Sequence, residues 1–346
     1  METFWYTAVT LMLAIYVVLD GFDFGVGTLY PFLGRSEADR HVMHAAIGPV
    51  WNGNEVWLIA AGAVLFLAFP KAYAAGFSGF YLALIIVLWL FMFRGLAMEL
   101  RSHVDHPLWR QLCDGTFFGA SLLLAVVFGV ALGNLIRGVP LSRDGYFFVA
   151  LWTDFMPGPK PGILDWFTVL VGLASAAILA LHGANYLAMK TTGDLYARAV
   201  AVAKHMSWLA FGSAVLVMLG IMFIQPNLRP NYTAHPVGYV FPVGGALALI
   251  VTLVLQRRQR DVAAFMTSSL FILAMLGSLA WGCYPNILIA TTDAENSLTI
   301  YNAATNAYGL QVSAQWFVIG FALIVVYQIF LHRTFWGKVP AHKAEA

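Results

Sequence analysis

Two carboxylates lie inside an apolar stretch near the start of the chain. Asp20 and Asp23 are three residues apart, a spacing that puts both side chains on one face of a helix. Gly21 and Gly25 form a small-xxx-small pair that lets another helix approach closely. An acid at the centre of a membrane helix costs about 2.5–3.5 kcal/mol, so the pair predicts a functional site. The alternative is a helix cap beside a packing motif.

A second polar group combines aromatic, amide and acid side chains. Trp51, Asn52, Asn54 and Glu55 follow Pro49, a residue that suits the first turn of a helix. Trp residues commonly anchor helices at the membrane interface, and this alternative would explain Trp51 without a functional role. It does not account for two amides and an acid in the same turns. These residues are therefore also predicted to be functional.

Three further charged residues lie near the ends of the next two apolar segments. Arg94 falls inside one segment, Glu99 follows five residues later, and Asp114 opens the next segment. The alternative for Arg94 is a side chain that snorkels to the membrane surface. The alternative for Asp114 is a helix cap that complements the helix dipole.

The histidines predict no redox metal in this chain. Of the nine histidines, His182 alone is predicted to lie within a membrane span. A haem held by two histidines needs a second buried ligand, and the sequence offers none. His182 is therefore interpreted as an inter-helix hydrogen-bonding residue, with cofactor binding as the weaker alternative. The chain is expected to ligate no haem or other metal itself.

Membrane helices are the elements that position these side chains. The chain has 346 residues, 60% hydrophobic and 10% charged, with a mean hydropathy of +0.76. Soluble domains carry about 25% charged residues, which excludes an ordinary cytosolic protein. The net charge of +2 gives no footprint for nucleic acid. The sequence predicts an all-α integral membrane protein with about nine transmembrane helices. The predicted spans are residues 4–27, 47–69, 73–99, 114–136, 163–189, 204–224, 237–255, 263–283 and 310–331.

Basic residues predict the orientation of these helices, because Lys and Arg in short loops are retained on the cytoplasmic side. With the N-terminus outside and the C-terminus inside, most of the 19 Lys and Arg residues fall in cytoplasmic segments. Those residues are Arg35, Arg40, Arg101, Arg110, Lys190, Arg198, Lys204, Arg257, Arg258, Arg260, Arg333, Lys338 and Lys343. The same orientation brings the candidate polar residues to one membrane depth. Four neighbouring helices would there form a polar pocket open to the cytoplasm.

Five motifs together resemble subunit II of the cytochrome bd-type quinol oxidases. They are VLDGFDFGVG at 18–27, GPVWNGNEVWL at 48–58, FRG at 93–95, GNLIRGVP at 133–140 and LHGA at 181–184. The resemblance implies a bacterial inner-membrane heterodimer with subunit I, which carries the quinol site, two haems b and one haem d. Such a complex oxidises ubiquinol or menaquinol, reduces dioxygen to water and takes up protons from the cytoplasm. Lipids, quinone and small single-helix accessory subunits are further expected partners.

The resemblance also implies two four-helix bundles and one additional helix. The bundles are expected over residues 1–136 and 163–283, and the additional helix over 310–331. Residues 332–346 are then expected to form a cytoplasmic tail.

Residue roles carry over from the family only at matching positions. Asp23 matches the second acid of the first-helix motif, and Trp51, Arg94 and Asp114 match positions that the family links to haem retention or activity. Asn52 departs from the family pattern, since many members have Asp there as part of a cytoplasmic proton route. An amide does not titrate, so the family's role for this position is in doubt here.

Three functions remain open on these residues. The first is a non-haem oxidase subunit that stabilises subunit I and forms a hydrated proton path, with Asp23 and Glu55 titrating and Arg94 keeping a nearby acid ionised. The second is a secondary transporter, although transporter sites usually lie near the membrane midplane. The third is a purely structural subunit whose polar cluster only pairs with subunit I.

Overall fold

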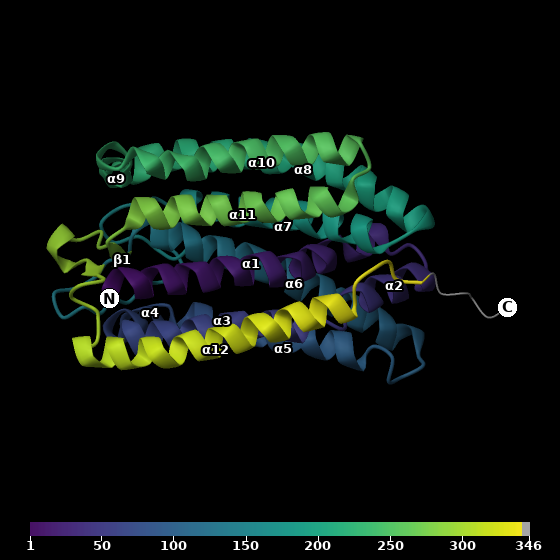
Figure 1. Cartoon of the computed structure of the whole chain (residues 1–346), viewed down its shortest axis with the longest axis horizontal. Helices are drawn as coiled ribbons and strands as arrows, with labels where there is room; N and C mark the ends of the chain where they lie inside the picture. Colours follow the sequence, from purple (N-terminus) through teal and green to yellow (C-terminus); the bar gives the residue numbers. More distant parts are fainter. Residues whose placement is uncertain (341–346) are drawn as a thin grey trace.

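Long helices running side by side make up the computed structural model, which describes residues 1–340 (Figure 1). The predicted tail residues 341–346 lie outside the described residues. The helices are α1 (Glu2–Leu33), α2 (Glu37–Ile47), α3 (Trp51–Ala68), α4 (Pro70–Gly79), α5 (Tyr81–Leu100), α6 (Pro107–Arg137), α7 (Trp166–Lys190), α8 (Gly193–Ile224), α9 (Arg229–Ala234), α10 (Val240–Arg257), α11 (Asp261–Cys283) and α12 (Ala307–Thr334). Short 3₁₀ turns are η1 (Pro226–Leu228), η2 (Pro236–Tyr239) and η3 (Ala294–Asn296), and the strands are β1 (Asn286–Leu288) and β2 (Leu298–Thr299).

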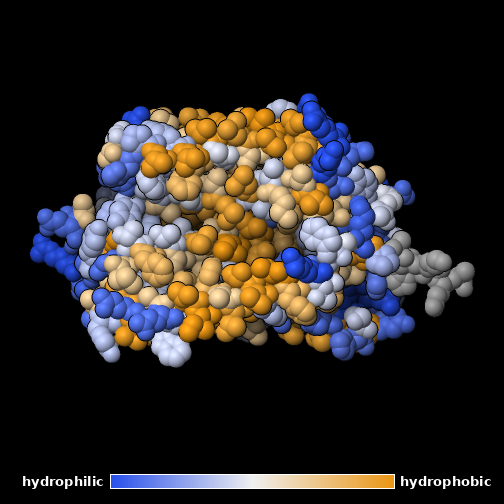
Figure 2. Space-filling view, viewed as in Figure 1, coloured by the Kyte–Doolittle hydropathy of each residue, from blue (hydrophilic) through white to orange (hydrophobic). Residues whose placement is uncertain are grey.

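The surface has the character of a membrane protein. On the face drawn in Figure 2, apolar side chains cover the middle of the molecule and hydrophilic side chains gather at its two ends. Within residues 1–340, 8 helices are long and apolar enough to cross a membrane, or up to 9 if α2 and α3 count as one bent span. The predicted all-α membrane fold with about nine spans is confirmed.

The helices pack in two neighbouring groups. Helices α3 and α6 pack on α1 and α5 packs on α6, while α7, α8, α10 and α11 form the second group. The groups meet where α1 crosses α7. The two helices lie so close there that a Cβ built on Gly25 would be 2.0 Å from the carbonyl oxygen of Leu179. Helix α12 lies against α3. The division into bundles at 1–136 and 163–283 stays a prediction.

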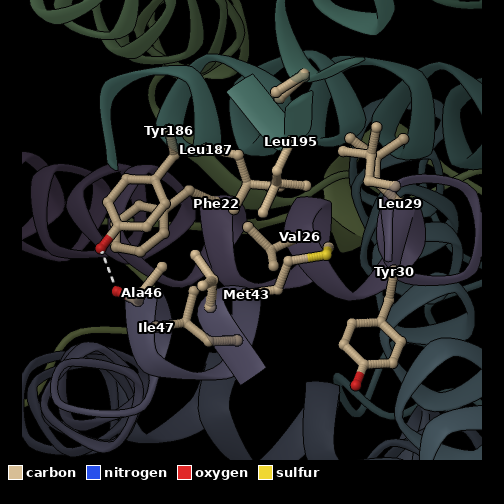
Figure 3. Close-up of a cluster of buried hydrophobic side chains, with 14 of the residues drawn as sticks. Phe22, Val26, Leu29, Tyr30, Met43, Ala46, Ile47, Tyr186, Leu187 and Leu195 are labelled. Atoms are coloured by element: carbon tan, nitrogen blue, oxygen red, sulfur yellow. Dashed lines mark hydrogen bonds between the residues drawn. The ribbon is translucent and has the colours of Figure 1, made fainter. Parts of the chain in front are cut away.

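Helix α2 and its hinge were not predicted. The span expected at 47–69 starts instead at Trp51, after a turn at residues 48–50, and α2 meets α3 at an angle of 42°. Ser36 and Asp39 form a reciprocal capping box that begins α2. Its apolar face packs on α1 and α7, where the Tyr186 hydroxyl donates to the Ala46 carbonyl at 2.7 Å (Figure 3).

Several other predicted helix bounds were wrong. The span expected at 204–224 begins about three turns earlier, at Gly193, and the first span runs on to Leu33 instead of ending at 27. The span expected at 73–99 is divided at Phe80 into α4 and α5, and the ring of Phe147 packs against Gly79 at the end of α4. The span expected to open at Asp114 begins two turns earlier, at Pro107, with His106 as its N-cap. The apolar windows missed this start because charged and polar residues occupy the first turns of α6.

The two ends of the molecule differ. The β1 end, on the left in Figure 1, carries the chain's N-terminus and two loops that join through a bridge between Val139 and Ala290. A buried ion pair between Arg137 and Asp165 fixes α6 to the start of α7 there. The α2 end, on the right, carries α2 and the end of α12. The candidate acids lie toward the α2 end.

Candidate functional site

Arg94 is the centre of a buried charge cluster formed by α1, α3 and α5. Its side chain has no exposed surface, and Nη2 donates to Asp20 Oδ1 at 2.7 Å. Nη1 donates to Glu55 Oε1 at 3.3 Å, and Asp23 Oδ2 lies 3.9 Å from Nη2. The guanidinium also lies 4.5 Å from the centre of the Phe24 ring. Snorkelling to the surface is excluded for Arg94, since the side chain turns inward.

Two amides extend this cluster from Asp23 toward α12. Asn54 Nδ2 donates to Asp23 Oδ2 at 2.8 Å, and Gln328 Nε2 donates to Asn54 Oδ1 at 2.9 Å. All three side chains are buried. We call the six residues Asp20, Asp23, Asn54, Glu55, Arg94 and Gln328 the Arg94 cluster.

The Arg94 cluster contains more acid than base. Three carboxylates face one guanidinium, and Asp20 and Asp23 have no exposed surface. Within residues 1–340, Asp20 Oδ2, Asp23 Oδ1 and Arg94 Nε have no hydrogen-bond partner although they are buried. Buried polar groups are almost always satisfied, by protein or by water. The two carboxylate oxygens therefore call for water or for an exchangeable proton, and Arg94 Nε calls for an acceptor such as water.

Glu55 connects the buried acids with the surface of the chain. Its side chain is 22% exposed, whereas those of Asp20, Asp23 and Arg94 are fully buried. Trp51, one turn earlier on α3, lies with its ring 5.9 Å from the Arg94 guanidinium. Glu55 is therefore the member of the cluster that water or a partner protein can reach.

Two predicted site residues lie apart from the Arg94 cluster. Asn52 and Glu99 are exposed, and no hydrogen bond or ion pair joins either of them to the acids within the described residues. On an α-helix, residues two positions apart point about 200° away from each other. Asn52 therefore faces outward when Asn54 faces inward. Glu99 lies five positions from Arg94 and likewise occupies another face. The prediction that all candidates share one pocket was wrong.

Asp114 belongs to a second cluster, nearer the α2 end. It accepts from Arg101 Nε at 2.6 Å, from Arg40 Nη1 at 3.0 Å and from the Tyr30 hydroxyl at 2.9 Å. Arg101 Nη2 also donates to Glu37 at 2.9 Å. We call these five residues the Asp114 cluster. It ties α1, α2 and the end of α5 to α6, so the alternative of a simple helix cap at Asp114 does not describe its contacts.

Hydrogen bonds in the Asp114 cluster favour the charged form of Arg101. Burial acts to lower the pKa of Arg101, but hydrogen bonds to Asp114 and Glu37 outweigh it and raise that pKa above its usual value. Both oxygens of Asp114 receive donors from guanidinium groups. This arrangement holds helix ends together and leaves no free acceptor on Asp114.

His182 joins three helices. Its Nε2 lies 3.0 Å from the Val18 carbonyl oxygen, and its Nδ1 lies 2.8 Å from Ser268 Oγ. Because a carbonyl only accepts, Nε2 carries a proton, while Nδ1 pairs with a serine hydroxyl that also lies 2.8 Å from the Phe265 carbonyl oxygen. Both nitrogens are engaged, so His182 does not fit an axial haem ligand. Within residues 1–340, no group of three or more His, Cys, Asp or Glu side chains suits a metal ion.

Two amides of the Arg94 cluster were less visible in the sequence than its charges. Asn54 was predicted to be functional only as part of the group from Trp51 to Glu55, and Gln328 was not predicted. A single Gln in an apolar helix is itself a signal, because a polar side chain in the membrane is costly and needs a partner. Its partner, however, lies 274 positions away in the chain.

Comparisons with known proteins agree with this architecture. The family model described as cytochrome bd terminal oxidase subunit II matches residues 1–335. The chain is 30% identical to cytochrome bd-I ubiquinol oxidase subunit 2 of Escherichia coli (strain K12) over 367 residues, covering 99% of this chain and 96% of that protein. It is 29% identical to cytochrome bd ubiquinol oxidase subunit 2 of Bacillus subtilis (strain 168), covering 98% and 96% of the two chains. In fold it matches a chain of the bd oxidase from Geobacillus thermodenitrificans with a TM-score of 0.76 and 19% identity, covering 96% and 98%.

Proposed function

Because the chain belongs to the cytochrome bd terminal oxidase subunit II family, we propose that it both stabilises subunit I and supplies protons to it. Family membership makes the chain part of a quinol oxidase complex in the bacterial inner membrane. The partner is the subunit I that the family implies. In this proposal subunit I carries the quinol site, the two haems b and the haem d, so the redox chemistry takes place there.

The orientation in this proposal has the N-terminus outside and the α2 end in the cytoplasm. The basic residues of the segments at the α2 end support it, since positive loops are retained on that side. Arg35, Arg40, Arg101 and Arg110 all lie between helices at this end or in α2 and the start of α6. Protons taken from the cytoplasm would then reach the Arg94 cluster from its nearer end.

The excess of carboxylates over guanidinium in the Arg94 cluster carries the proton-uptake proposal. Glu55 Oε atoms exchange a proton with cytoplasmic water, because this side chain alone among the three acids reaches the surface. Arg94 binds Glu55 and Asp20 at the same time and compensates one negative charge. Water on Asp20 Oδ2 and Asp23 Oδ1 would carry the proton onward, as those oxygens are buried and without protein partners within residues 1–340.

A purely structural role is the competing proposal, and the Asp114 cluster is the observation that favours it. That cluster shows how this chain uses charges to join helices: its acid is fully paired with arginines. Secondary transport fits less well, because the acids gather toward one end of the helices and the chain belongs to an oxidase family.

Replacing Asp23 with Asn separates the two proposals. The variant keeps the side-chain shape and removes one titrating group, so turnover per haem is expected to fall by about tenfold or more while haem content stays normal. Quinol-driven oxygen consumption and the reduced-minus-oxidised haem spectrum of the purified complex measure both quantities. Asp105→Asn is the matched control, because Asp105 is a 91% exposed acid outside both clusters.

Unchanged turnover in Asp23→Asn, together with unchanged haem content, would sink the proton-uptake role and leave the structural one. Loss of haem from Asp23→Asn with normal turnover of the remaining complex would point the same way.

A further inference from the structure

Helix α12 has little contact with the rest of the chain, yet it carries a buried amide. Within α12 three residues are buried, namely Leu310, Gln328 and Leu331, and most other positions of the helix are exposed. Exposed apolar side chains on a membrane helix face lipid or a partner and need no special explanation. A buried Gln among them is costly unless a partner satisfies it.

A notch on α3 lets α12 come close enough for Gln328 to find that partner. A Cβ on Gly53 would lie 2.7 Å from Leu331 Cδ2 and 3.3 Å from the Tyr327 hydroxyl. Tyr327 and Leu331 flank Gln328 on α12, and Gly53 directly precedes Asn54 on α3. Small residues at membrane helix contacts permit such close approach. The close approach of α3 and α12 at Gly53 therefore lies directly beside the contact between the two amides.

Three neighbours fix how the Asn54 amide is turned. Asn54 Nδ2 lies 2.8 Å from Asp23 Oδ2 and 3.3 Å from the Leu19 carbonyl oxygen, and a reversed amide would point its oxygen at these two acceptors. The opposite atom, Asn54 Oδ1, accepts from Gln328 Nε2 at 2.9 Å, so Gln328 holds the oxygen side of the amide. Gln328 Nε2 also lies 3.3 Å from His332 Nδ1, and within residues 1–340 the buried Gln328 Oε1 has no hydrogen-bond partner.

We propose that Gln328 is a positioning residue for proton uptake, which holds Asn54 so that its amide donates to Asp23. Amides do not titrate, so Gln328 and Asn54 orient the acid and carry no proton themselves. In this role α12, whose other residues are mostly exposed, contributes one side chain that orients the Arg94 cluster. The inference rests on the proposed proton-uptake function of Asp23.

Two substitutions of Gln328 test this role in the complete oxidase. Gln328→Leu and the nearly isosteric Gln328→Met both remove the donor while keeping an apolar helix that fits the membrane. Loss of the hydrogen bond from Gln328 to Asn54 predicts a fall in kcat of about three- to tenfold, with the quinol KM unchanged. The solvent deuterium isotope effect on kcat should rise, because proton delivery becomes more rate-limiting. Gln311→Leu is the matched control: the same change on the same helix at an exposed position near the β1 end.

A double-variant comparison shows whether Gln328 acts through Asp23. In the Asp23→Asn background the group that Gln328 positions no longer titrates, so adding Gln328→Leu should change kcat by less than about twofold. Independent, multiplying losses in the double variant would overturn the inference. So would a Gln328→Leu oxidase that matches Gln311→Leu in kcat and isotope effect, or one that loses only haem content.

Different results contradict the proton-uptake function of Asp23 and the positioning role of Gln328. Wild-type turnover in Asp23→Asn alone contradicts the proton-uptake function, whatever Gln328 does. Impaired turnover in Asp23→Asn with normal turnover in both Gln328 variants contradicts only the positioning role.

Discussion

The Arg94 cluster and the Asp114 cluster combine carboxylates and guanidiniums in different proportions. In the Arg94 cluster one guanidinium serves three acids, of which Asp20 and Asp23 are fully buried. In the Asp114 cluster two guanidiniums and a tyrosine hydroxyl converge on one buried acid. Charges are compensated in the second case and unbalanced in the first. The difference separates a group of residues that holds helices together from one that can bind and release protons.

Their positions in the fold fit this division. The Asp114 cluster joins the ends of α1, α2 and α6, where helix ends meet water and where a charge costs less. The Arg94 cluster lies inside the helix group, where an unpaired carboxylate is far more costly. Sequence alone would treat Asp114 and Asp23 alike, as acids in apolar segments. Their partners make them different.

Arg94→Leu should have the largest effect of any single substitution. Removing one partner of a buried pair costs about 3–5 kcal/mol, and here three acids lose their one cation. We expect the amount of assembled, haem-containing complex in membranes to fall by about tenfold or more. Arg110→Leu is the control, because Arg110 pairs with the exposed Asp105 at the surface. Normal assembly and normal turnover in Arg94→Leu would show that the acids need no compensation.

Asp114→Asn should weaken the fold and leave catalysis intact. Asparagine keeps the shape of the side chain but loses the charge that Arg40 and Arg101 share. The midpoint of thermal inactivation is expected to fall by roughly 3–8 °C. Turnover per haem of the surviving complex is expected to stay within about twofold of wild type. A strong loss of turnover at normal stability would assign Asp114 to the proton path and erase the contrast between the clusters.

The stabilising effect of Arg101 should not depend on pH in the ordinary range. Hydrogen bonds to Asp114 and Glu37 outweigh burial and raise the pKa of Arg101. A raised folded-state pKa contributes stability below the unfolded-state pKa and loses it only as pH rises through the folded-state value. Both values lie far above the ordinary pH range for arginine, so the contribution persists across neutral pH. The Tm difference between wild type and Arg101→Leu should therefore agree within about 1 °C at pH values of roughly 6 and 9.

Apolar windows were enough to predict the membrane fold. Uninterrupted hydrophobic segments such as 163–189 and 263–283 lie close to α7 and α11, because the bilayer thickness sets their length. The search for apolar segments did not predict helix α2, because this helix is amphipathic and charged. Its signal was a different one, the Ser36 and Asp39 capping box. The break before α5 had no such signal in the apolar pattern, and Gly79 beside it packs against Phe147 from a distant loop.

The candidate site was predicted as far as it depends on helix spacing. Asp20, Asp23 and Arg94 stood out because buried charges are rare in apolar segments. The sequence could not decide which of Asn52 and Asn54 faces inward, since that choice depends on the packing of α3. Gln328 could not be linked to either residue, as the contact joins α3 to α12 across most of the chain.

Asn52→Asp should have the smallest effect, and it tests the comparison at the position where the motif resemblance led us to expect an acid. The new acid would stand on the exposed face of α3, apart from the Arg94 cluster. Proton uptake through Glu55 and Asp23 does not use that face, so turnover should change by less than about twofold. Oxygen consumption of the purified complex over a range of quinol concentrations measures it, with Asp23→Asn as the positive control. A severalfold gain in turnover would mean that residue 52 belongs to the proton path, and that the Arg94 cluster alone does not complete it.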